Sequence, residues 1–191
     1  MWTRRQRQMC IRDSSKYVGG SPTNISIGCS RLGLKSALIT RVGNEHMGRF
    51  VIEQLRREGV NVSNIKTDKD RLTALVILGI RSQDQFPLIF FRENCADMAL
   101  CEDDIEEDFI KNSKSVLVTG THFSTKTVSD ASFKAMKIAK KFNKEVILDI
   151  DYRPNLWEMG KHNEGESRFK ENLSVTNHIQ NILSYCTLIV G

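Results

Sequence analysis

The chain has 191 residues, of which 40% are hydrophobic and 27% are charged, and its formal net charge is +5. That length is enough to bury the core of a single α/β domain. Residues 1–16 hold five basic side chains and one acidic one, which leaves a net charge of +1 for residues 17–191. Basic and acidic side chains alternate in that larger part, which argues against a nucleic-acid-binding patch.

The sequence also argues against membrane and metal partners. No apolar run approaches the ~20 residues that span a bilayer, and no signal peptide is visible. The five cysteines are odd in number and form no Cys-x-x-Cys pair. We therefore expect no metal site, no disulfide framework and no membrane partner, and a reducing cytoplasm is the expected compartment.

The start of the chain is unusual. Residues 1–16 show neither alternation nor an apolar run, so they predict no strand or helix. Residues 9–14 read Met-Cys-Ile-Arg-Asp-Ser, which matches the translation of a common transposon-based sequencing adaptor. We interpret 1–16 as a non-native or disordered leader and 17–191 as the domain; natural coding sequence across those codons in the source DNA would refute this hypothesis.

The first predicted element is a helix over 23–32, opened by a tight loop with Gly19 and Gly20, and with Thr23 or Asn24 near its N-cap. Glycine lets the backbone approach a ligand closely, and the unpaired amides of a first helical turn suit hydroxyls, carboxylates or phosphates. Asn24 adds a donor and an acceptor. The alternative is an ordinary capped loop, because glycine marks loops of every kind.

A strand over 35–42 and a helix over 46–58 follow, and then two apolar runs flank a five-residue polar loop. This pattern predicts a β-hairpin over 72–93. Because a hairpin is out of register with a βαβ repeat, we expect an accessory lid over about 72–99. Arg92 lies at the base of that lid, where it can pair with a carboxylate or carbonyl of a substrate; an ordinary exposed arginine is the alternative.

The remaining elements alternate between helices and strands. Their predicted bounds are helix 103–112, strand 115–119, helix 127–142, strand 145–151, helix 166–183 and strand 186–190. Such alternation predicts a mainly parallel sheet that is flanked by helices and has right-handed crossovers. His122 is the histidine nearest to the expected ligand edge of that sheet, and a structural role is the alternative for it.

Charged residues gather at the carboxyl end of the apolar run 146–150. Asp149, Asp151 and Arg153 lie close together in the sequence there. Ligands of open α/β sheets bind at this edge, so these side chains are candidate binding residues. A carboxylate beside a guanidinium is also the pattern of a structural ion pair, and the residues alone leave both interpretations open.

The spacing of the first motif resembles a known family. Gly19 and Gly20, then Asn24, then Gly33 and Gly43 follow in the order of the N-terminal signature of the PfkB (ribokinase-like) carbohydrate kinases. The resemblance implies a ribokinase-like α/β fold with a small β lid over the sugar. It also implies that the glycine pair and the asparagine touch the sugar.

Two further segments sharpen the resemblance. Residues 149–157 are similar to the Asp-x-Asn-x-Arg-x-x-Leu-Trp segment of the sugar-acid branch, and 90–100 is similar to the matching segment of the 5-dehydro-2-deoxygluconokinases of myo-inositol breakdown. Asp151 stands where many members have Asn. The resemblance implies substrate binding by Arg92, Asp151 and Arg153. It also implies transfer of the γ-phosphoryl group of ATP, with Mg²⁺, to the C6 hydroxyl of 5-dehydro-2-deoxy-D-gluconate.

The catalytic base of that family is not found. PfkB kinases use an Asp in a C-terminal Gly-Ala-Gly-Asp loop, and none of the glycines after Gly120 begins such a pattern. We therefore expect a fold truncated at both ends, with the base and most of the ATP site beyond Gly191. Alternatives are a 2-dehydro-3-deoxygluconokinase, a fructokinase or a non-catalytic sugar-binding remnant, and the lid of this family implies a possible homodimer.

Overall fold

The computed structural model describes residues 15–78, 88–152, 157 and 171–191. Among these residues, every strand pair except one hairpin is parallel. The three groups of paired strands are β1 (Thr40–Gly43) with β2 (Ile65–Asp68), the antiparallel β3 (Leu75–Leu78) with β4 (Leu88–Phe91), and β5 (Ser115–Thr119) with β6 (Glu145–Asp149) and β7 (Leu188–Val190). This arrangement confirms the expected α/β class with a mainly parallel sheet.

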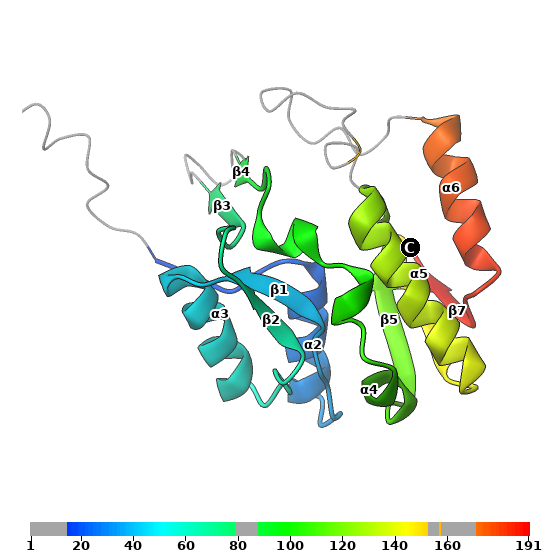
Figure 1. Cartoon of the computed structure of the whole chain (residues 1–191), viewed down its shortest axis with the longest axis horizontal. Coiled ribbons are helices and arrows are strands. Elements are labelled where there is room, and N and C mark those ends of the chain that lie inside the picture. Colours follow the sequence, from blue (N-terminus) through cyan, green and yellow to red (C-terminus); the bar gives the residue numbers. More distant parts are fainter. Residues whose placement is uncertain (1–14, 79–87, 153–156, 158–170) are drawn as a thin grey trace, which may run out of the picture.

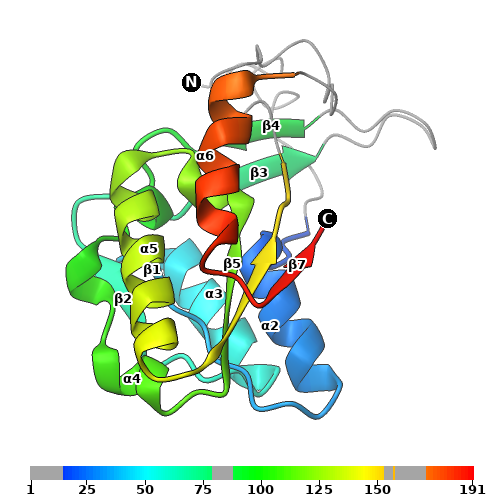
Figure 2. The same ribbon diagram turned by 90° about the vertical axis from the view of Figure 1, so that its right-hand side faces the viewer.

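Helices cover the strands on two sides. The described helices are α2 (Ser21–Arg31), α3 (His46–Arg57), α4 (Glu107–Lys111), α5 (Lys126–Lys141) and α6 (Leu173–Leu183), with short 3₁₀ turns η1 (Ala96–Ala99), η2 (Glu102–Asp104) and η3 (Gly120–Phe123). Figure 1 shows their order along the chain, and Figure 2 shows α5 and α6 on one side of β6 and α2 on the other. None of the described helices is long and apolar enough to cross a membrane.

The larger core lies between α5 and the sheet of β5, β6 and β7. The helix buries Val128, Ala131, Ala135 and Ala139, which recur at spacings of three and four residues and so share one face. Three of these four side chains are alanine, which lets the helix backbone approach the sheet closely. Opposite them, Leu148 of β6 is fully buried. This packing fixes β5 and β6 and therefore the position of the loops that follow them.

A second, smaller core holds β1, β2 and α3 together. Its buried members are Leu38, Val42, Leu55, Val60 and Ile65. The helix α3 starts where the Glu45 carboxylate accepts hydrogen bonds from the backbone amides at positions 47 and 48, which is N-capping by a side chain. The predicted helix 46–58 is therefore confirmed to within one residue.

One predicted strand needs correction, and one observed strand was not predicted. The expected strand 35–42 is shorter, because the chain makes only an isolated bridge from Ala37 to Asn61 before it joins β2 at Thr40. No sequence pattern predicts β2, because its four residues are too few and too polar to form an apolar run. Its pairing with β1 is decided by tertiary packing of Ile65 against the smaller core.

The expected helix 103–112 is also wrong in its first half. The helix α4 begins only at Glu107, and a separate turn, η2, precedes it. The reason is Asp104, whose carboxylate accepts hydrogen bonds from the Cys101 amide and from the Arg41 guanidinium. Asp104 is buried in these contacts, and Ile105 after it is extended, so the first turn cannot continue as a helix.

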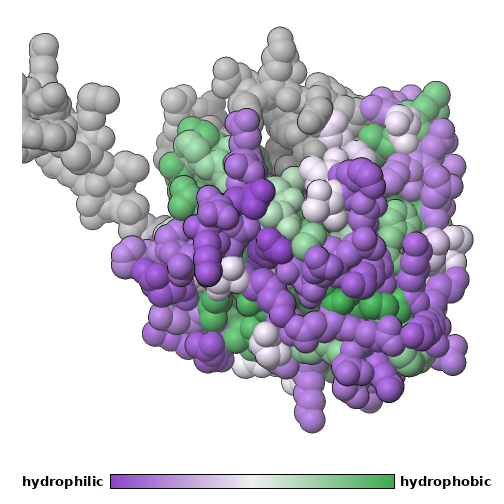
Figure 3. Space-filling view, viewed as in Figure 1, coloured by the Kyte–Doolittle hydropathy of each residue, from purple (hydrophilic) through white to green (hydrophobic). Residues whose placement is uncertain are grey.

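The predicted hairpin is present, and it is strongly apolar on its surface. Leu75 pairs with Phe91 and Ile77 pairs with Ile89, while the loop at 79–87 lies outside the described residues. Side chains of both strands are exposed, including Val76 at 45% and Phe91 at 52%. Figure 3 shows the resulting hydrophobic surface over β3, and Figure 2 places the hairpin beyond the carboxyl end of β6.

Candidate functional site

The carboxyl ends of β5, β6 and β7 lie at one edge of the sheet. Thr119 pairs with Asp149, and Asp149 pairs with Val190, so the three strands end in register. Gly120 begins the turn after β5, and a Cβ at this position would lie 2.0 Å from the carbonyl oxygen of Ile150. Only glycine fits there, because the chain after β5 runs directly against the chain after β6.

His122 lies in η3, directly after β5, and is half-buried. The Thr119 hydroxyl lies 2.9 Å from the Thr121 hydroxyl and 3.3 Å from Nδ1 of His122. Since Thr119 and Thr121 are buried, this short chain of polar groups fixes the imidazole against the end of the strand.

Three charged groups surround the imidazole. Burial is the largest cause that lowers the pKa of His122, and the positive charge of Arg92 adds to it, while the carboxylates of Asp97 and Asp151 act in the opposite direction; the resulting pKa is about 4. His122 is therefore neutral at pH 7 and can donate or accept a hydrogen bond without carrying charge. The same interactions place Arg92, at the base of the hairpin, and Asp151, after β6, near His122 at this edge.

Asp151 follows β6 by two residues and has a φ of 28°, which is unusual for a residue other than glycine. A backbone of this kind is costly and is most often found where a side chain must be held for function. Of its predicted neighbours, Asp149 is half-buried at the end of β6, and Arg153 lies outside the described residues. The structure thus brings Asp151 to the expected edge, and its pairing with Arg153 stays a prediction.

Arg92 follows β4 directly, at the base of the hairpin. Its Nε and Nη2 lie 2.9 and 2.8 Å from the same oxygen, Oδ2 of Asp97. The arginine side chain is only 22% exposed, so it is not the ordinary exposed arginine of the alternative interpretation. Asp97 engages Nε and Nη2 of the five-donor guanidinium, through a single carboxylate oxygen.

The glycine loop differs from the prediction in its cap. The helix α2 starts at Ser21, with Gly20 as its N-cap at a φ of 95° and Pro22 in its first turn. Glycine adopts this φ without strain, and proline suits a first turn because its missing N–H would have no partner there. The prediction of Thr23 or Asn24 near the N-cap is therefore wrong, since both lie inside the helix.

This loop lies near the same edge of the sheet. The helix α2 contacts β5, and Figure 2 shows its N-terminal end at the same end of the molecule as the carboxyl end of β6. Asn24 is exposed, and a Cβ at Gly19 would meet nothing within 4 Å, so there is open space beside the loop. Contact of Gly19, Gly20 and Asn24 with a sugar remains a prediction.

Sequence reasoning missed three polar residues of this edge. Thr119 and Thr121 position His122, and Asp97 holds Arg92, yet none of them had been assigned a role. Asp97 follows Arg92 by five residues in the segment 90–100, which was the one signal in the sequence. Nothing in that spacing shows that a 3₁₀ turn brings the two side chains together.

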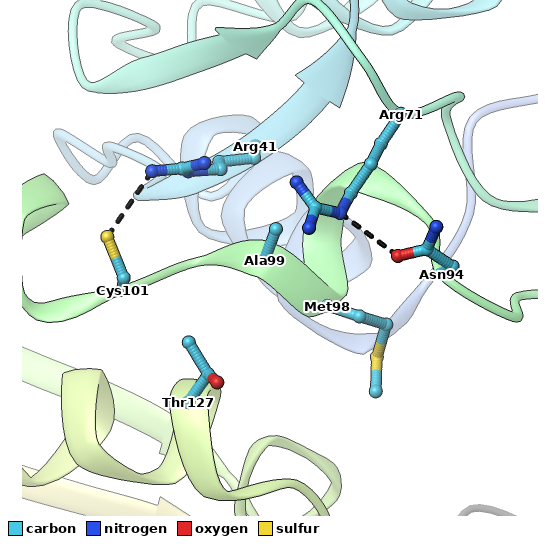
Figure 4. Close-up of a pocket in the computed structure, with 7 residues that line it drawn as sticks. All are labelled: Arg41, Arg71, Asn94, Met98, Ala99, Cys101 and Thr127. Atoms are coloured by element: carbon cyan, nitrogen blue, oxygen red, sulfur yellow. Dashed lines mark hydrogen bonds between the residues drawn. The ribbon is translucent and has the colours of Figure 1, made fainter.

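A pocket of about 300 Å³ lies on another part of the segment after the hairpin (Figure 4). Its lining residues are Arg41, Arg71, Asn94, Met98, Ala99, Cys101 and Thr127. Arg41 binds Asp104 through two nitrogens, at 2.6 and 3.1 Å, and lies 3.4 Å from Asp68. Although burial alone would raise the pKa of Asp104, the bonds from Arg41 and from the Cys101 amide lower it.

The charges of that pocket are balanced within the protein. Arg71 lies 3.3 Å from Asp68 and donates to Asn94 at 3.1 Å, so both arginines have acidic partners. Asp68 also accepts hydrogen bonds from the amides of Asp70 and Arg71. We interpret this group as a structural ion-pair network that joins β1 and β2 to η2.

The described residues include no group of three or more His, Cys, Asp or Glu side chains that could hold a metal ion. Mg²⁺ that is bound together with a nucleotide is held mainly by one or two carboxylates and by the phosphates. We therefore assign no described residue to a metal ion or to a nucleotide.

The fold matches solved structures of sugar kinases. The PfkB protein from Polaromonas sp. JS666 aligns with a TM-score of 0.76 at 24% identity, over 87% of this chain and 53% of that one. A fructokinase from Xylella fastidiosa with bound ATP aligns with a TM-score of 0.76 at 20% identity, over 90% of this chain and 50% of that one. At these identities the likeness shows the fold, and it confirms the ribokinase-like α/β class.

The sequence comparison is more specific. The pfkB family carbohydrate kinase profile matches residues 5–168, so this chain belongs to the pfkB family of carbohydrate kinases. It is 39% identical over 145 residues to the 5-dehydro-2-deoxygluconokinase of Geobacillus kaustophilus (strain HTA426), which is 75% of this chain and 43% of the relative. The protein of that name from Bacillus licheniformis is 40% identical over 144 residues, 75% of this chain and 44% of the relative. The chain thus spans less than half the length of these two relatives.

Proposed function

We propose that this chain is the substrate-binding part of an ATP-dependent kinase that phosphorylates 5-dehydro-2-deoxy-D-gluconate at its C6 hydroxyl, in myo-inositol catabolism. The observation that carries the proposal is the convergence of Arg92, His122 and Asp151 at the carboxyl edge of β5 and β6. The names of relatives at 39 and 40% identity support the same substrate.

The proposed roles follow from the chemistry of each group. Arg92 would bind the substrate carboxylate or carbonyl with N–H groups that Asp97 leaves free, since charge-assisted hydrogen bonds are the strong ones. A neutral His122 can hydrogen-bond the sugar without placing a second positive charge beside that arginine. Gly20 and the first turn of α2 would offer backbone amides to hydroxyl groups, and Asn24 its side-chain amide.

Phosphoryl transfer asks a protein mainly for positioning and for stabilisation of charge. The described residues supply the positioning of the sugar. When bound, ATP would supply the γ-phosphoryl group, and Mg²⁺ would neutralise charge on its phosphates. We propose that the base that deprotonates the C6 hydroxyl lies beyond Gly191, so no residue described here is assigned that proton.

The exposed hairpin supports two further parts of the proposal. Strands β3 and β4 would close over the sugar as a lid, which would exclude water from the transfer. Their exposed apolar side chains, such as Val76, Ile89 and Phe91, would also allow two copies to pair as a homodimer through the lid. The cytoplasm is the proposed compartment of the kinase.

Arg92 also helps to rank the alternatives. Fructose has no carboxylate, so a partly buried guanidinium at the site favours a sugar acid over a fructokinase substrate. A 2-dehydro-3-deoxygluconokinase would use the same guanidinium, so Arg92 does not separate the two sugar acids. A non-catalytic sugar-binding remnant would retain the edge and lack the transfer.

The test begins with the source DNA downstream of the codon for Gly191. The protein encoded by the whole reading frame is assayed for ADP release with ATP and each of three acceptors: 5-dehydro-2-deoxy-D-gluconate, 2-dehydro-3-deoxy-D-gluconate and fructose. We expect the first to have the highest kcat/KM, with the phosphate on C6 by NMR. A higher kcat/KM for either other acceptor would overturn the substrate, and a stop codon at that point together with sugar binding but no ADP release would favour the remnant.

A further inference from the structure

One charged atom at the proposed sugar site has no partner. Asp97 Oδ1 is buried and accepts no hydrogen bond in the part of the chain that the structure describes. The other buried side-chain atoms without partners in that part belong to Asn64, Thr125, Trp157 and His178, and none of those groups is an ion pair member. Because a buried carboxylate oxygen loses more hydration than a neutral group, this is the costliest of the five to leave unpaired.

The geometry of the ion pair explains why the atom is free. Arg92 directs both Nε and Nη2 at Oδ2 of Asp97, at 2.9 and 2.8 Å, and leaves Oδ1 aside. A guanidinium and a carboxylate can instead pair through both oxygens, as Arg41 and Asp104 do. The one-sided arrangement leaves one acceptor of Asp97 without a partner among the described residues, directly beside the guanidinium of Arg92.

The position of the pair points to the sugar. Asp97 and Arg92 both act on His122, which follows β5, so the pair lies between the base of the hairpin and the carboxyl edge of the sheet. Oδ1 itself is covered, and the exposed 20% of the side chain belongs to its other atoms, so a ligand hydroxyl reaches Oδ1 when the groups that cover it move aside on binding. The oxygens of a carboxylate can only accept hydrogen bonds.

We propose that Oδ1 of Asp97 accepts a hydrogen bond from a secondary hydroxyl of the sugar acid, while Arg92 binds an oxygen that can only accept. This inference rests on the proposed function and adds to it a residue that determines specificity. The Asp97 carboxylate only accepts hydrogen bonds, and the Arg92 guanidinium only donates them. Because the ion pair holds the two groups side by side, they bind a hydroxyl and a carbonyl or carboxylate oxygen in one orientation. The pair would therefore select the sugar and fix the direction in which its chain lies.

The test compares ligands as well as variants. Binding is measured by calorimetry without ATP, on the protein of the kinase assay, for 5-dehydro-2-deoxy-D-gluconate and for analogues that lack its C3 or its C4 hydroxyl. We expect loss of one of these hydroxyls to weaken binding about 10–100-fold, the range for a hydrogen bond to a charged group. Asp97→Asn should bind the parent ligand more weakly to a similar degree. Its affinity for the analogue that lacks the affected hydroxyl should be little lower than its affinity for the parent ligand.

Asp130→Asn is the matched control, because Asp130 is an exposed carboxylate that pairs with Lys126 at 2.6 Å on the outside of α5. It should bind all three ligands as the unchanged protein does. Equal weakening of all three ligands in Asp97→Asn would mean that Asp97 only orients Arg92, and would overturn the proposal. If Asp97→Asn does not fold, the unchanged protein decides alone, since equal affinity for all three ligands also overturns it.

The outcome also separates this inference from the proposed function. If the substrate is wrong, another sugar acid, such as 2-dehydro-3-deoxy-D-gluconate, binds in place of the expected one. The same comparison is then made with the deoxy analogues of that sugar acid. If removal of one hydroxyl weakens binding to the unchanged protein but not to Asp97→Asn, the inference is supported although the proposed substrate is wrong. Failure of the unchanged protein to bind any sugar acid overturns both.

Discussion

Two arginine–aspartate groups in this molecule look alike and differ in how completely their carboxylate oxygens are paired. The network of Arg41 and Asp104 binds through both carboxylate oxygens, and its other members, Asp68 and Arg71, also have partners. The pair of Arg92 and Asp97 uses one carboxylate oxygen, and the other is buried and has no partner among the residues that the structure describes.

The difference teaches how to separate a structural ion pair from a binding site. A saturated network gains all the hydrogen bonds it can make on folding, and a ligand would have to break some of them. An unsaturated pair loses stability on folding and regains it when a ligand supplies the missing partner. The second pattern lies at the edge of the sheet where parallel α/β folds bind ligands.

The largest effect is expected from Gly120→Ala, which should disrupt the carboxyl edge of β5 and β6 without changing the ion-pair network of Arg41 and Asp104. The new Cβ would lie 2.0 Å from the Ile150 carbonyl oxygen, so the loops after β5 and β6 must move apart. We expect a loss of roughly 3 kcal/mol or more in the free energy of unfolding, measured with urea. Gly19→Ala is the control, because its Cβ meets nothing, and an equal loss in both variants would contradict the close approach.

A smaller effect is expected from pH, through His122. Its pKa is about 4 in the folded protein and near 6.5 when unfolded, so between these values the unfolded chain binds more protons. Stability should therefore fall by roughly 2–3 kcal/mol as the pH drops from about 6.5 to 4.5. Urea unfolding at several pH values measures this, and His122→Gln should flatten the curve; the same slope in that variant would assign the effect to another group.

Asp104→Asn tests the structural half of the comparison. It removes one charge from a largely buried pair whose other member, Arg41, then keeps the longer contact with the Asp68 carboxylate and the contact with the Cys101 sulfur. We expect a loss of about 2 kcal/mol in stability and no change in sugar-acid affinity. Asp97→Asn should do the reverse, and weaker ligand binding in Asp104→Asn would show that the two groups are not separate.

The smallest effect is expected from Arg71→Gln. Arg71 is 36% exposed and its contact with Asp68 is 3.3 Å long, so hydration offsets much of the stabilisation that this ion pair contributes. The urea midpoint should stay within experimental error of the unchanged protein. Arg41→Gln, measured beside it, should lower the midpoint clearly, and a larger shift in Arg71→Gln would reverse their order within the network.

Much of the fold could be predicted because its signals are local. The helix α5 buries one side chain per turn, and the strands β5 and β6 are short apolar runs between polar ends. The polar strand β2 and the separate turn η2 could not be predicted, since one depends on packing beside β1 and the other on a hydrogen bond from Arg41 to Asp104. These contacts join residues 25 and 63 positions apart, which is too far for a periodic sequence pattern to detect.

The sequence by itself determined the class of this protein, its family and the residues at the ends of its strands. Motif spacing and apolar periodicity are properties of neighbouring residues, so they survive without a fold. Only the tertiary structure decided which arginines are saturated and which carboxylate oxygen is left free, because a hydrogen bond depends on angstrom-scale placement of atoms from distant elements. It brought Arg92, Asp97, His122 and Asp151 to one edge, and so made four separate residues into one candidate site.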